Sequence, residues 1–402
     1  MNDYSFIKDI GRSYIVSSFI PAALFVTIGT LIFIDFAPSF ITGGFIENDQ
    51  FYYITKWGIL IIILTWVSFA LYSGWHFTVQ LFEGYYIKEN FLGKWLTKSH
   101  KRRVKKGSRA IRKTYRLQQM DEEGLTDEIG AKIIKWQPRA KQAFLSLESW
   151  YPVSMHDKKL SWIMPTRLGN VLRSGEFYPK NKYGFDGILI WPRLVHLFPK
   201  TYSDQLEESN NKFIFLLNSA FLSWLIGLMC LAVSLIRFPC TVLNTSWLKS
   251  AYLKPYSNFF CPSTFTQSQN FFQRGFSHLD GGDYFLLGIL FIALGYLIYR
   301  ISVIAAVEFS KIIRSGFDLY RFELLKALHQ RIPKDLDEER AIWEKICHIL
   351  ISGDELSRTI PELNYTQSDS EESSKEDPVK PVTPILYIFK RKKITVMKID
   401  QN

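Results

Sequence analysis

Cysteine is scarce in this chain, with 4 Cys among 402 residues. That number is too small for a secreted scaffold held together by disulfides. Charged residues are not in excess either, at 22% of the sequence, which argues against a disordered polyelectrolyte. The mean hydropathy is close to zero, but this average combines long apolar blocks with very polar segments. The chain is therefore neither a simple soluble protein nor a fibrous one.

The signature motifs of common enzyme classes are also missing. The sequence contains no GxxxxGK[ST] phosphate-binding loop and no GxSxG nucleophile turn. None of the 7 His forms HExxH or pairs with a Cys at zinc-ligand spacing. We therefore predict no catalytic, cofactor-binding or metal-ligating residues and treat the chain as a non-enzyme. A lipid-modifying membrane enzyme is kept as an alternative that no motif supports.

Four apolar blocks dominate the sequence, over 14–37, 57–79, 213–236 and 284–307. Each is long enough to be a membrane helix, because roughly 20 apolar residues cross the hydrocarbon core. The first block is too long for a signal peptide and has no cleavage site after it. We expect a mainly α, polytopic membrane protein with four transmembrane helices and an α-helical cytoplasmic module.

The positive charge is distributed unevenly between the polar segments. Segment 81–209 holds 24 Lys and Arg against 14 Asp and Glu, whereas loop 238–283 has only three basic residues. Loops rich in Lys and Arg stay in the cytoplasm. The sequence therefore predicts that 81–209 and both termini are cytoplasmic and that loop 238–283 faces outward, as in a multi-pass protein of the inner membrane.

Composition divides the chain into five parts. They are 1–80 with the first two spans, 81–209 as a basic helical domain, 210–307 with the last two spans, 308–365 as cytoplasmic helices, and 366–402 as a tail. The tail begins with an acidic linker. Its two β-rich runs flank a basic turn, which predicts a short C-terminal β-hairpin.

Each apolar block carries a stripe of small or polar residues, which suits close helix packing in lipid. The stripes are Ser18, Ala22 and Gly29; Gly58, Thr65 and Tyr72; Ser219, Ser223, Gly227 and Ser234; and Gly288, Gly295 and Ser302. They predict a four-helix bundle. No ionisable residue lies near a block's centre, which argues against a coupled transporter. Asn218 is expected to make an interhelical hydrogen bond.

A run of basic residues, 98–116, follows the second block and contains no acid. The candidate lipid-binding residues are Lys101, Arg102, Arg103, Lys105, Lys106, Arg109, Arg112 and Lys113. Val104, Ile111 and Tyr115 form a narrow apolar line, so this segment has the pattern of a helix that lies on an anionic leaflet. Two alternatives remain: a solvated charged face, and nucleic-acid binding, which no surrounding module supports.

The most distinctive segment is 164–200, MPTRLGNVLRSGEFYPKNKYGFDGILIWPRLVHLFPK. Pro165 and Thr166 predict a helix start, and Tyr178-Pro179 predicts its end. This segment and FDLYRFELLKAL at 317–328 resemble blocks of uncharacterised bacterial four-span membrane proteins, a resemblance that implies no activity. The polar residues in the segment are either a site or helix caps and ion pairs. They are Asn170, Arg173, Glu176, Asp186 and Arg193.

Cys240 and Cys261 share the loop expected to face outward. Disulfides persist in oxidising compartments, so we predict a bridge between them, with two free thiols as the alternative. Closing a loop of this length would stabilise the fold by roughly 3 kcal/mol in the chain-entropy model.

Together these features predict a membrane-anchored scaffold, signalling or lipid-contacting module without a cofactor. The expected partners are the lipid bilayer, anionic lipid headgroups, and either further copies of the chain or other proteins. An oligomeric ion channel or pore-forming subunit, lined by the small-residue stripes, is the alternative from a different functional class.

Overall fold

The structure is a computed structural model that describes residues 11–33, 50–122, 127–152, 160–242, 279 and 281–357. All regular elements in these ranges are helical. The C-terminal hairpin expected within 366–402 lies outside the described residues. The chain divides into two compact units, Met1–Thr78 with Asn211–Ile304, and Val79–Asn210 with Ala305–Asn402.

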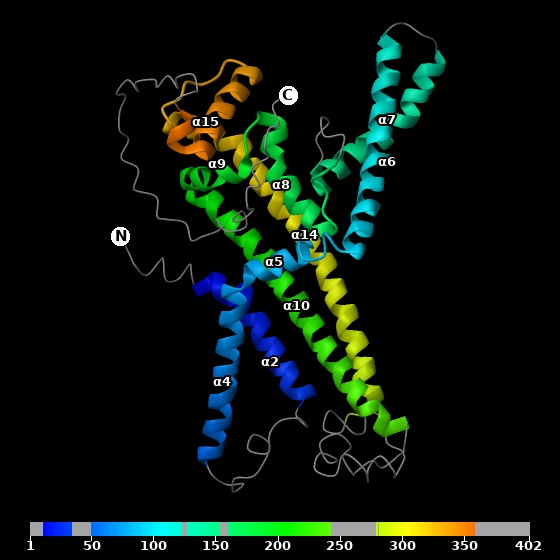
Figure 1. Cartoon of the computed structure of the whole chain (residues 1–402), viewed down its shortest axis with the longest axis vertical. Helices are drawn as coiled ribbons and strands as arrows, with labels where there is room; N and C mark the ends of the chain where they lie inside the picture. Colours follow the sequence, from blue (N-terminus) through cyan, green and yellow to red (C-terminus); the bar gives the residue numbers. More distant parts are fainter. Residues whose placement is uncertain are drawn as a thin grey trace. The chain divides into compact units, whose positions relative to one another are not determined.

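The first unit contains the apolar helices (Figure 1). They are η1 (Ile15–Phe19), α2 (Ile20–Ile32), α4 (Gln50–Ser73), and parts of α10 (Lys200–Val242) and α14 (Gly281–Ala327). Among the described residues, three helical stretches are long and apolar enough to cross a membrane: Gly11–Ile32, Lys200–Ile236 and Gly281–Ala327. A fourth is added if α4 and α5 (Trp75–Glu83) are counted as one bent span. These helices indicate a multi-pass membrane protein.

The second predicted span, 57–79, is not one straight helix. The chain bends by 58° between α4 and α5. The break falls at Ser73-Gly74, and such Gly/Ser pairs are among the usual causes of sharp helix kinks. The Ser73 hydroxyl donates to the Phe69 carbonyl within α4, at 2.8 Å. With 24 residues, α4 alone is about 36 Å long, enough to cross the hydrocarbon core.

Two apolar clusters join the helices of the first unit. Ala22 of α2, Leu71 of α4 and Leu222 of α10 are buried together. The second cluster links α2 and α10 to Tyr284 of α14, whose hydroxyl donates to the Ile32 carbonyl at 3.0 Å. Helices α2, α4, α10 and α14 therefore all take part in one packed assembly.

Glycines bring α10 and α14 close together, as the small-residue stripes of the third and fourth blocks predicted. A Cβ at Gly227 would lie 2.8 Å from the Ile292 side chain and 3.1 Å from the Gly288 carbonyl oxygen. This approach lets the Ser223 hydroxyl of α10 donate to the Phe291 carbonyl of α14, at 2.9 Å. Close backbone approach with side-chain-to-backbone hydrogen bonds is the usual means of helix pairing in lipid.

The stripe on the second block serves this purpose only at Tyr72, which packs on Tyr14 with ring centroids 5.4 Å apart, and the prediction was wrong for Gly58 and Thr65. A Cβ at Gly58 would meet nothing within 4 Å, and Thr65 is exposed, bonding only to Ile61 of its own helix. The packed face of α4 instead contains Ser68, whose hydroxyl lies 2.5 Å from that of Tyr14. On the first block, Ser18 is buried, but Gly29 faces open space.

Asn218 makes the expected interhelical hydrogen bond. Its Nδ2 donates to the Ser17 carbonyl at 2.8 Å, and the side chain is fully buried. That carbonyl lies four residues before Pro21, which has no N–H to donate. Asn218 therefore supplies a hydrogen bond that the N-terminal helix cannot make for itself.

The second unit contains the N-terminal end of α10, up to Asn210, and the C-terminal part of α14, from Ala305 onward, in addition to helices of its own. Its own elements are α6 (Phe91–Glu122), α7 (Asp127–Trp150), α8 (Arg167–Tyr183), α9 (Gly187–Leu194), η3 (Val195–Leu197) and α15 (Leu336–Ser357). Helix α8 begins as predicted, with Thr166 accepting from the Gly169 N–H at 3.0 Å. It does not end at Pro179 but at Gly184, whose φ of 86° is the left-handed conformation that stops a helix.

Aromatic side chains form the core of the second unit. The largest side chains that are fully buried in it are Phe185, Trp191, Phe198, Phe309, Phe317 and Trp343. Phe185 and Trp343 pack with ring centroids 4.6 Å apart, joining the α8–α9 turn to α15. Trp191 packs on Phe317 of α14 at 5.4 Å. Segments 164–200 and 317–328, which were distinctive in the sequence, thus meet in one core.

Candidate functional site

The basic helix α6 is paired along its length with α7, and Figure 1 shows the two helices side by side. On α6 the residues at alternating spacings of three and four face inward, including His100, Val104 and Ile111. They meet Leu147 and Tyr151, so α6 and α7 run antiparallel. The apolar line expected to face lipid is therefore covered by α7 at Val104 and Ile111.

This pairing was missed although the sequence carries a signal for it. Inward-facing positions on α6 follow a heptad spacing, as in a coiled-coil seam: Thr97, His100, Val104, Gly107, Ile111 and Thr114. A Cβ at Gly107 would lie 2.9 Å from Cδ1 of Leu147, so the helices approach closely there. Helix α7 continues through Pro138.

The eight predicted lipid-binding residues lie on the outer side of this hairpin. Lys101 is half-buried and the other seven are exposed. Among the residues whose side chains the structure describes, which leaves out 120–131, none of the eight forms an ion pair with a carboxylate. Lys113 lies over the ring of Trp136 on α7, with Nζ 4.1 Å from the centroid, a cation–π contact. Most of these cations are therefore exposed on the side of α6 that faces away from α7.

His100 lies in the seam between α6 and α7. It is 6% exposed, and its Nδ1 lies 3.0 Å from the Tyr151 hydroxyl oxygen. Burial, together with the charges of Arg103 and Arg167, lowers the pKa of His100 to about 4. The ring is therefore neutral in the folded hairpin at physiological pH, whereas an exposed histidine has a pKa of about 6.5.

This difference predicts a hairpin that loosens in acid. Between pH 6.5 and pH 4 the unfolded chain binds a proton at His100 that the folded hairpin does not bind. The stability of the folded hairpin therefore decreases as the pH is lowered through this range. We expect a loss of roughly 1 to 2 kcal/mol at pH 5. Hydrogen exchange of α6 and α7, corrected for intrinsic rates, measures it. The His100→Gln variant should lose this pH dependence, and exposed His196→Gln should keep it. Equal pH dependence in both variants would contradict the assignment.

The polar residues predicted in 164–200 act mainly as structural ties. Asn170 is fully buried and holds its own helix start: its Oδ1 accepts from the Met164 N–H, and its Nδ2 donates to the Met164 and Thr166 carbonyls. Asp186 caps α9 by accepting from the Ile188 N–H. Arg193 donates to the Leu189 carbonyl in the same helix. These contacts favour the interpretation of helix caps over that of a site.

Arg173 joins this segment to the chain that follows α5. It is 3% exposed, and its guanidinium donates to the Tyr85 hydroxyl at 3.2 Å. Seven residues before Arg173, the Thr166 hydroxyl donates to the Glu83 carbonyl at 2.8 Å. Gly169 lies so close to that carbonyl that a Cβ would come within 2.5 Å of it. The connection from α5 to α6 is thus held against the start of α8.

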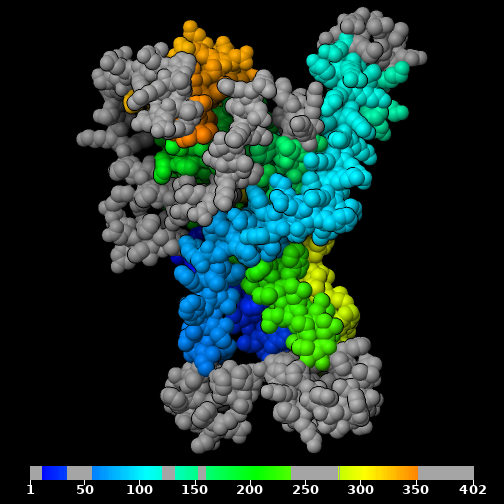
Figure 2. Space-filling view, viewed as in Figure 1, coloured from blue at the N-terminus to red at the C-terminus, as the bar shows by residue number. Residues whose placement is uncertain are grey.

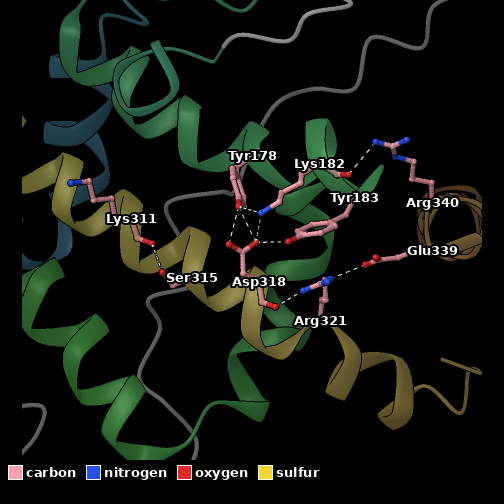
Figure 3. Close-up of polar contacts among 9 residues, drawn as sticks. All are labelled: Tyr178, Lys182, Tyr183, Lys311, Ser315, Asp318, Arg321, Glu339 and Arg340. Atoms are coloured by element: carbon pink, nitrogen blue, oxygen red, sulfur yellow. Dashed lines mark hydrogen bonds and ion pairs between the residues drawn. The ribbon is translucent and has the colours of Figure 1, made fainter. Parts of the chain in front are cut away.

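A second polar cluster surrounds Asp318 of α14 (Figure 3). Its Oδ1 accepts from the hydroxyls of Tyr178 at 2.9 Å and Tyr183 at 2.5 Å, and Lys182 Nζ lies 3.4 Å away. Burial and the hydrogen bond to Asp318 raise the pKa of Tyr183 to about 12 and also raise that of Tyr178. Both phenols therefore remain protonated donors at neutral pH, and the carboxylate is saturated with donors.

The cluster continues to α15 through Arg321, as Figure 3 shows. Its Nε donates to Glu339 Oε1 at 2.8 Å, and its guanidinium lies 4.2 Å from the Tyr183 ring centroid. Each strong donor in this group has its acceptor within the group, so the arrangement suits docking of helices better than chemistry on a substrate. Sequence reasoning missed it because its members are far apart in the chain.

Two further predictions concern cysteines and metals. Cys261 lies outside the described residues, as does the side chain of Cys240, so the bridge stays a prediction. Cys230 and Cys347 are buried free thiols. Over the described ranges, no group of three His, Cys, Asp or Glu side chains is arranged to hold a metal ion.

Comparison with known proteins gives no match: no protein-family model, no curated protein and no solved structure is significantly similar to this chain.

Proposed function

We propose that this chain is a membrane-anchored, non-enzymatic module that holds anionic lipid headgroups with the outer face of α6. The observation that carries the proposal is the charge on that face. Seven cations, Arg102 to Lys113, are exposed and form no ion pair among the side chains that the structure describes, while the inner side of α6 is occupied by α7. Pairing with α7 fixes the helix, so its cations are presented as a rigid array.

The energetics of this arrangement favour a lipid partner. Each Lys or Arg close to an anionic leaflet contributes about 1 kcal/mol, an attraction that salt weakens. For a protein that is free in solution, several such contacts give only weak binding to a membrane. Here the apolar helices already hold the chain at the membrane, which gives a high effective concentration of headgroups. Modest contacts on α6 therefore suffice.

The proposal includes an orientation. The Lys and Arg excess of segment 81–209 supports a cytoplasmic position for α6 and for both termini. The cytoplasmic leaflet of a membrane carries anionic lipid, which is the surface that this charge would meet. When protease has access only to the outer face of the membrane in intact cells, α6 and α7 should not be cleaved. Both helices should be cleaved after the cells are lysed.

A pore lined by the small-residue stripes has less support. Ser223, Gly227 and Gly288 are occupied by contacts between α10 and α14 of one chain. The open sites at Gly58 and Gly29 lie among apolar residues that suit lipid. An oligomeric channel would need a different lining.

The test compares two sets of neutralised lysines and arginines in the full-length chain. One variant carries Arg102→Gln, Arg103→Gln, Lys105→Gln and Lys106→Gln on α6. The matched control removes the same charge from other exposed positions of the second unit, through Lys180→Gln, Lys311→Gln, Lys326→Gln and Lys334→Gln. A donor dye on Tyr115→Cys, which is 61% exposed in the parent, reports the distance to headgroup acceptors in nanodiscs. All native cysteines are replaced by serine.

We expect energy transfer to rise when phosphatidylglycerol is added to phosphatidylcholine, and high salt to reverse the rise. The α6 variant should lose the response, whereas the control should keep it. If the parent does not respond, or if both variants respond like the parent, the basic face is solvated and the proposal is wrong.

A further inference from the structure

The first turn of α6 carries an apolar surface that the basic face does not explain. Phe91 is 86% exposed, Leu92 is 56% exposed and Trp95 is 60% exposed. Positions 91, 92 and 95 lie on one side of a helix, so these residues form one surface, here called the apolar end of α6. Figure 2 shows the start of α6, in light blue to cyan, at the molecular surface.

The structure around the apolar end of α6 is rigid. The preceding turn contains Gly84 at φ +84°, where a Cβ would lie 2.7 Å from Cγ of Pro165. A Cβ at Gly93 would lie only 1.8 Å from the Ile87 carbonyl oxygen, so the turn closes tightly on the helix. Together with the bonds of Thr166 and Arg173 described above, these contacts fix the direction in which the first turn of α6 points.

We propose that the apolar end of α6 is inserted into the lipid interface next to the second span. Covalent continuity supports this occupant, because α4 is an apolar helix and only α5 and one turn separate it from Phe91. The 58° bend at Gly74 turns the chain away from the direction of α4, as a segment that leaves the hydrocarbon for the interface requires. Under this assignment α4 alone is the second span.

The side chains around the apolar end match a lipid interface rather than a protein groove. Lys94 and Lys98 are exposed beside Trp95 on the same helix and can extend their ammonium groups toward headgroups while their stems lie on apolar surface. Tryptophan and phenylalanine next to lysine are typical of residues at the membrane–water boundary. The apolar end also continues directly into the basic face of α6, so both would meet one leaflet.

Insertion depends on apolar contact and is separable from the charge-dependent binding proposed above. The experiment therefore uses full-length protein in nanodiscs of pure phosphatidylcholine, which is uncharged. Nitroxide labels are placed singly on Phe91→Cys, Leu92→Cys and Trp95→Cys. The matched control is Ile351→Cys on α15, an apolar residue of the same unit that is 56% exposed. Collisions with oxygen and with a water-soluble nickel chelate report lipid and water, respectively.

At the three α6 positions we expect oxygen accessibility to exceed nickel accessibility, with the reverse at Ile351→Cys. High salt should not change this result. In unlabelled protein, brominated lipid should quench the tryptophan fluorescence of the parent more than that of Trp95→Phe. This measurement needs no nitroxide label, so it tests the position of Trp95 independently of any effect of the labels. Dominant nickel accessibility at positions 91, 92 and 95 would overturn the proposal. So would protection from both reagents, since another protein surface would then cover the apolar end. Either failure would leave the charge-dependent binding of α6 to be judged by its own test.

Discussion

The Gly227→Leu variant should lose the packing of α10 against α14. A side chain at this position would meet the Gly288 carbonyl oxygen at 3.1 Å, and backbone cannot move aside without separating the helices. Separation would also break the hydrogen bonds from Ser223 and Trp224 to α14. Overpacking costs about 3 kcal/mol, which exceeds the roughly 1 kcal/mol that replacing glycine gains in helix propensity. The thermal midpoint of detergent-purified protein should fall clearly.

The Gly58→Leu variant is the matched control for this prediction. A Cβ there meets nothing within 4 Å, so only the gain in helix propensity remains. Its thermal midpoint should equal or slightly exceed that of the parent. Similar losses in the two variants would show that glycine is needed in these helices for a reason other than contact between α10 and α14.

The Trp343→Ala variant should release α15 from the second unit. Trp343 is fully buried against Phe185, and its indole N–H points to Glu339, which also holds Arg321. Removing a buried tryptophan of this kind costs about 3 to 5 kcal/mol. Because α15 is joined to α14 by a short connection, it can detach without unfolding the apolar helices. Rapid hydrogen exchange and proteolysis within Leu336–Ser357 would report the release.

Ile351→Ala on the same helix is the control for α15. Ile351 is 56% exposed, and surface substitutions of this kind change stability by about 0.5 kcal/mol or less. Exchange across α15 should match the parent. If Trp343→Ala also leaves exchange unchanged, the aromatic core does not hold α15, and the contacts from Arg321 to Glu339 would have to do so alone.

The two polar clusters of the second unit have a common physical role. Asp318 accepts hydrogen bonds from tyrosines of α8, and Arg321 forms a hydrogen bond with Glu339 of α15. Such satisfied networks fix how helices dock, because a group left without its partner in a buried site is costly. The rigid docking of α8 in turn fixes the turn before α6, through Thr166 and Arg173. The direction of the surfaces of α6 that we propose to face lipid thus depends on packing elsewhere in the unit.

Some features of this protein follow from local sequence alone. The apolar blocks identified the membrane helices because a charge-free apolar run of that length matches the thickness of the hydrocarbon core. Thr166 marked the start of α8, since a hydroxyl at that position satisfies an exposed N–H. The glycines of the last two blocks indicated close helix contact. The hydrophobic effect does not drive helix association in lipid, so helices pair through close packing, and small residues permit the close approach of the two backbones.

Other features were decided only by tertiary structure. Gly58 and Gly227 look alike in sequence, but only Gly227 has a helix against it. Val104 and Ile111 fit a lipid-facing line equally well until α7 covers them, because an apolar stripe does not specify its partner. The cluster around Asp318 joins residues more than a hundred positions apart, and no local pattern encodes such a meeting. Sequence thus determined which segments are apolar, charged or helical, whereas packing determined which of their faces are covered by other helices.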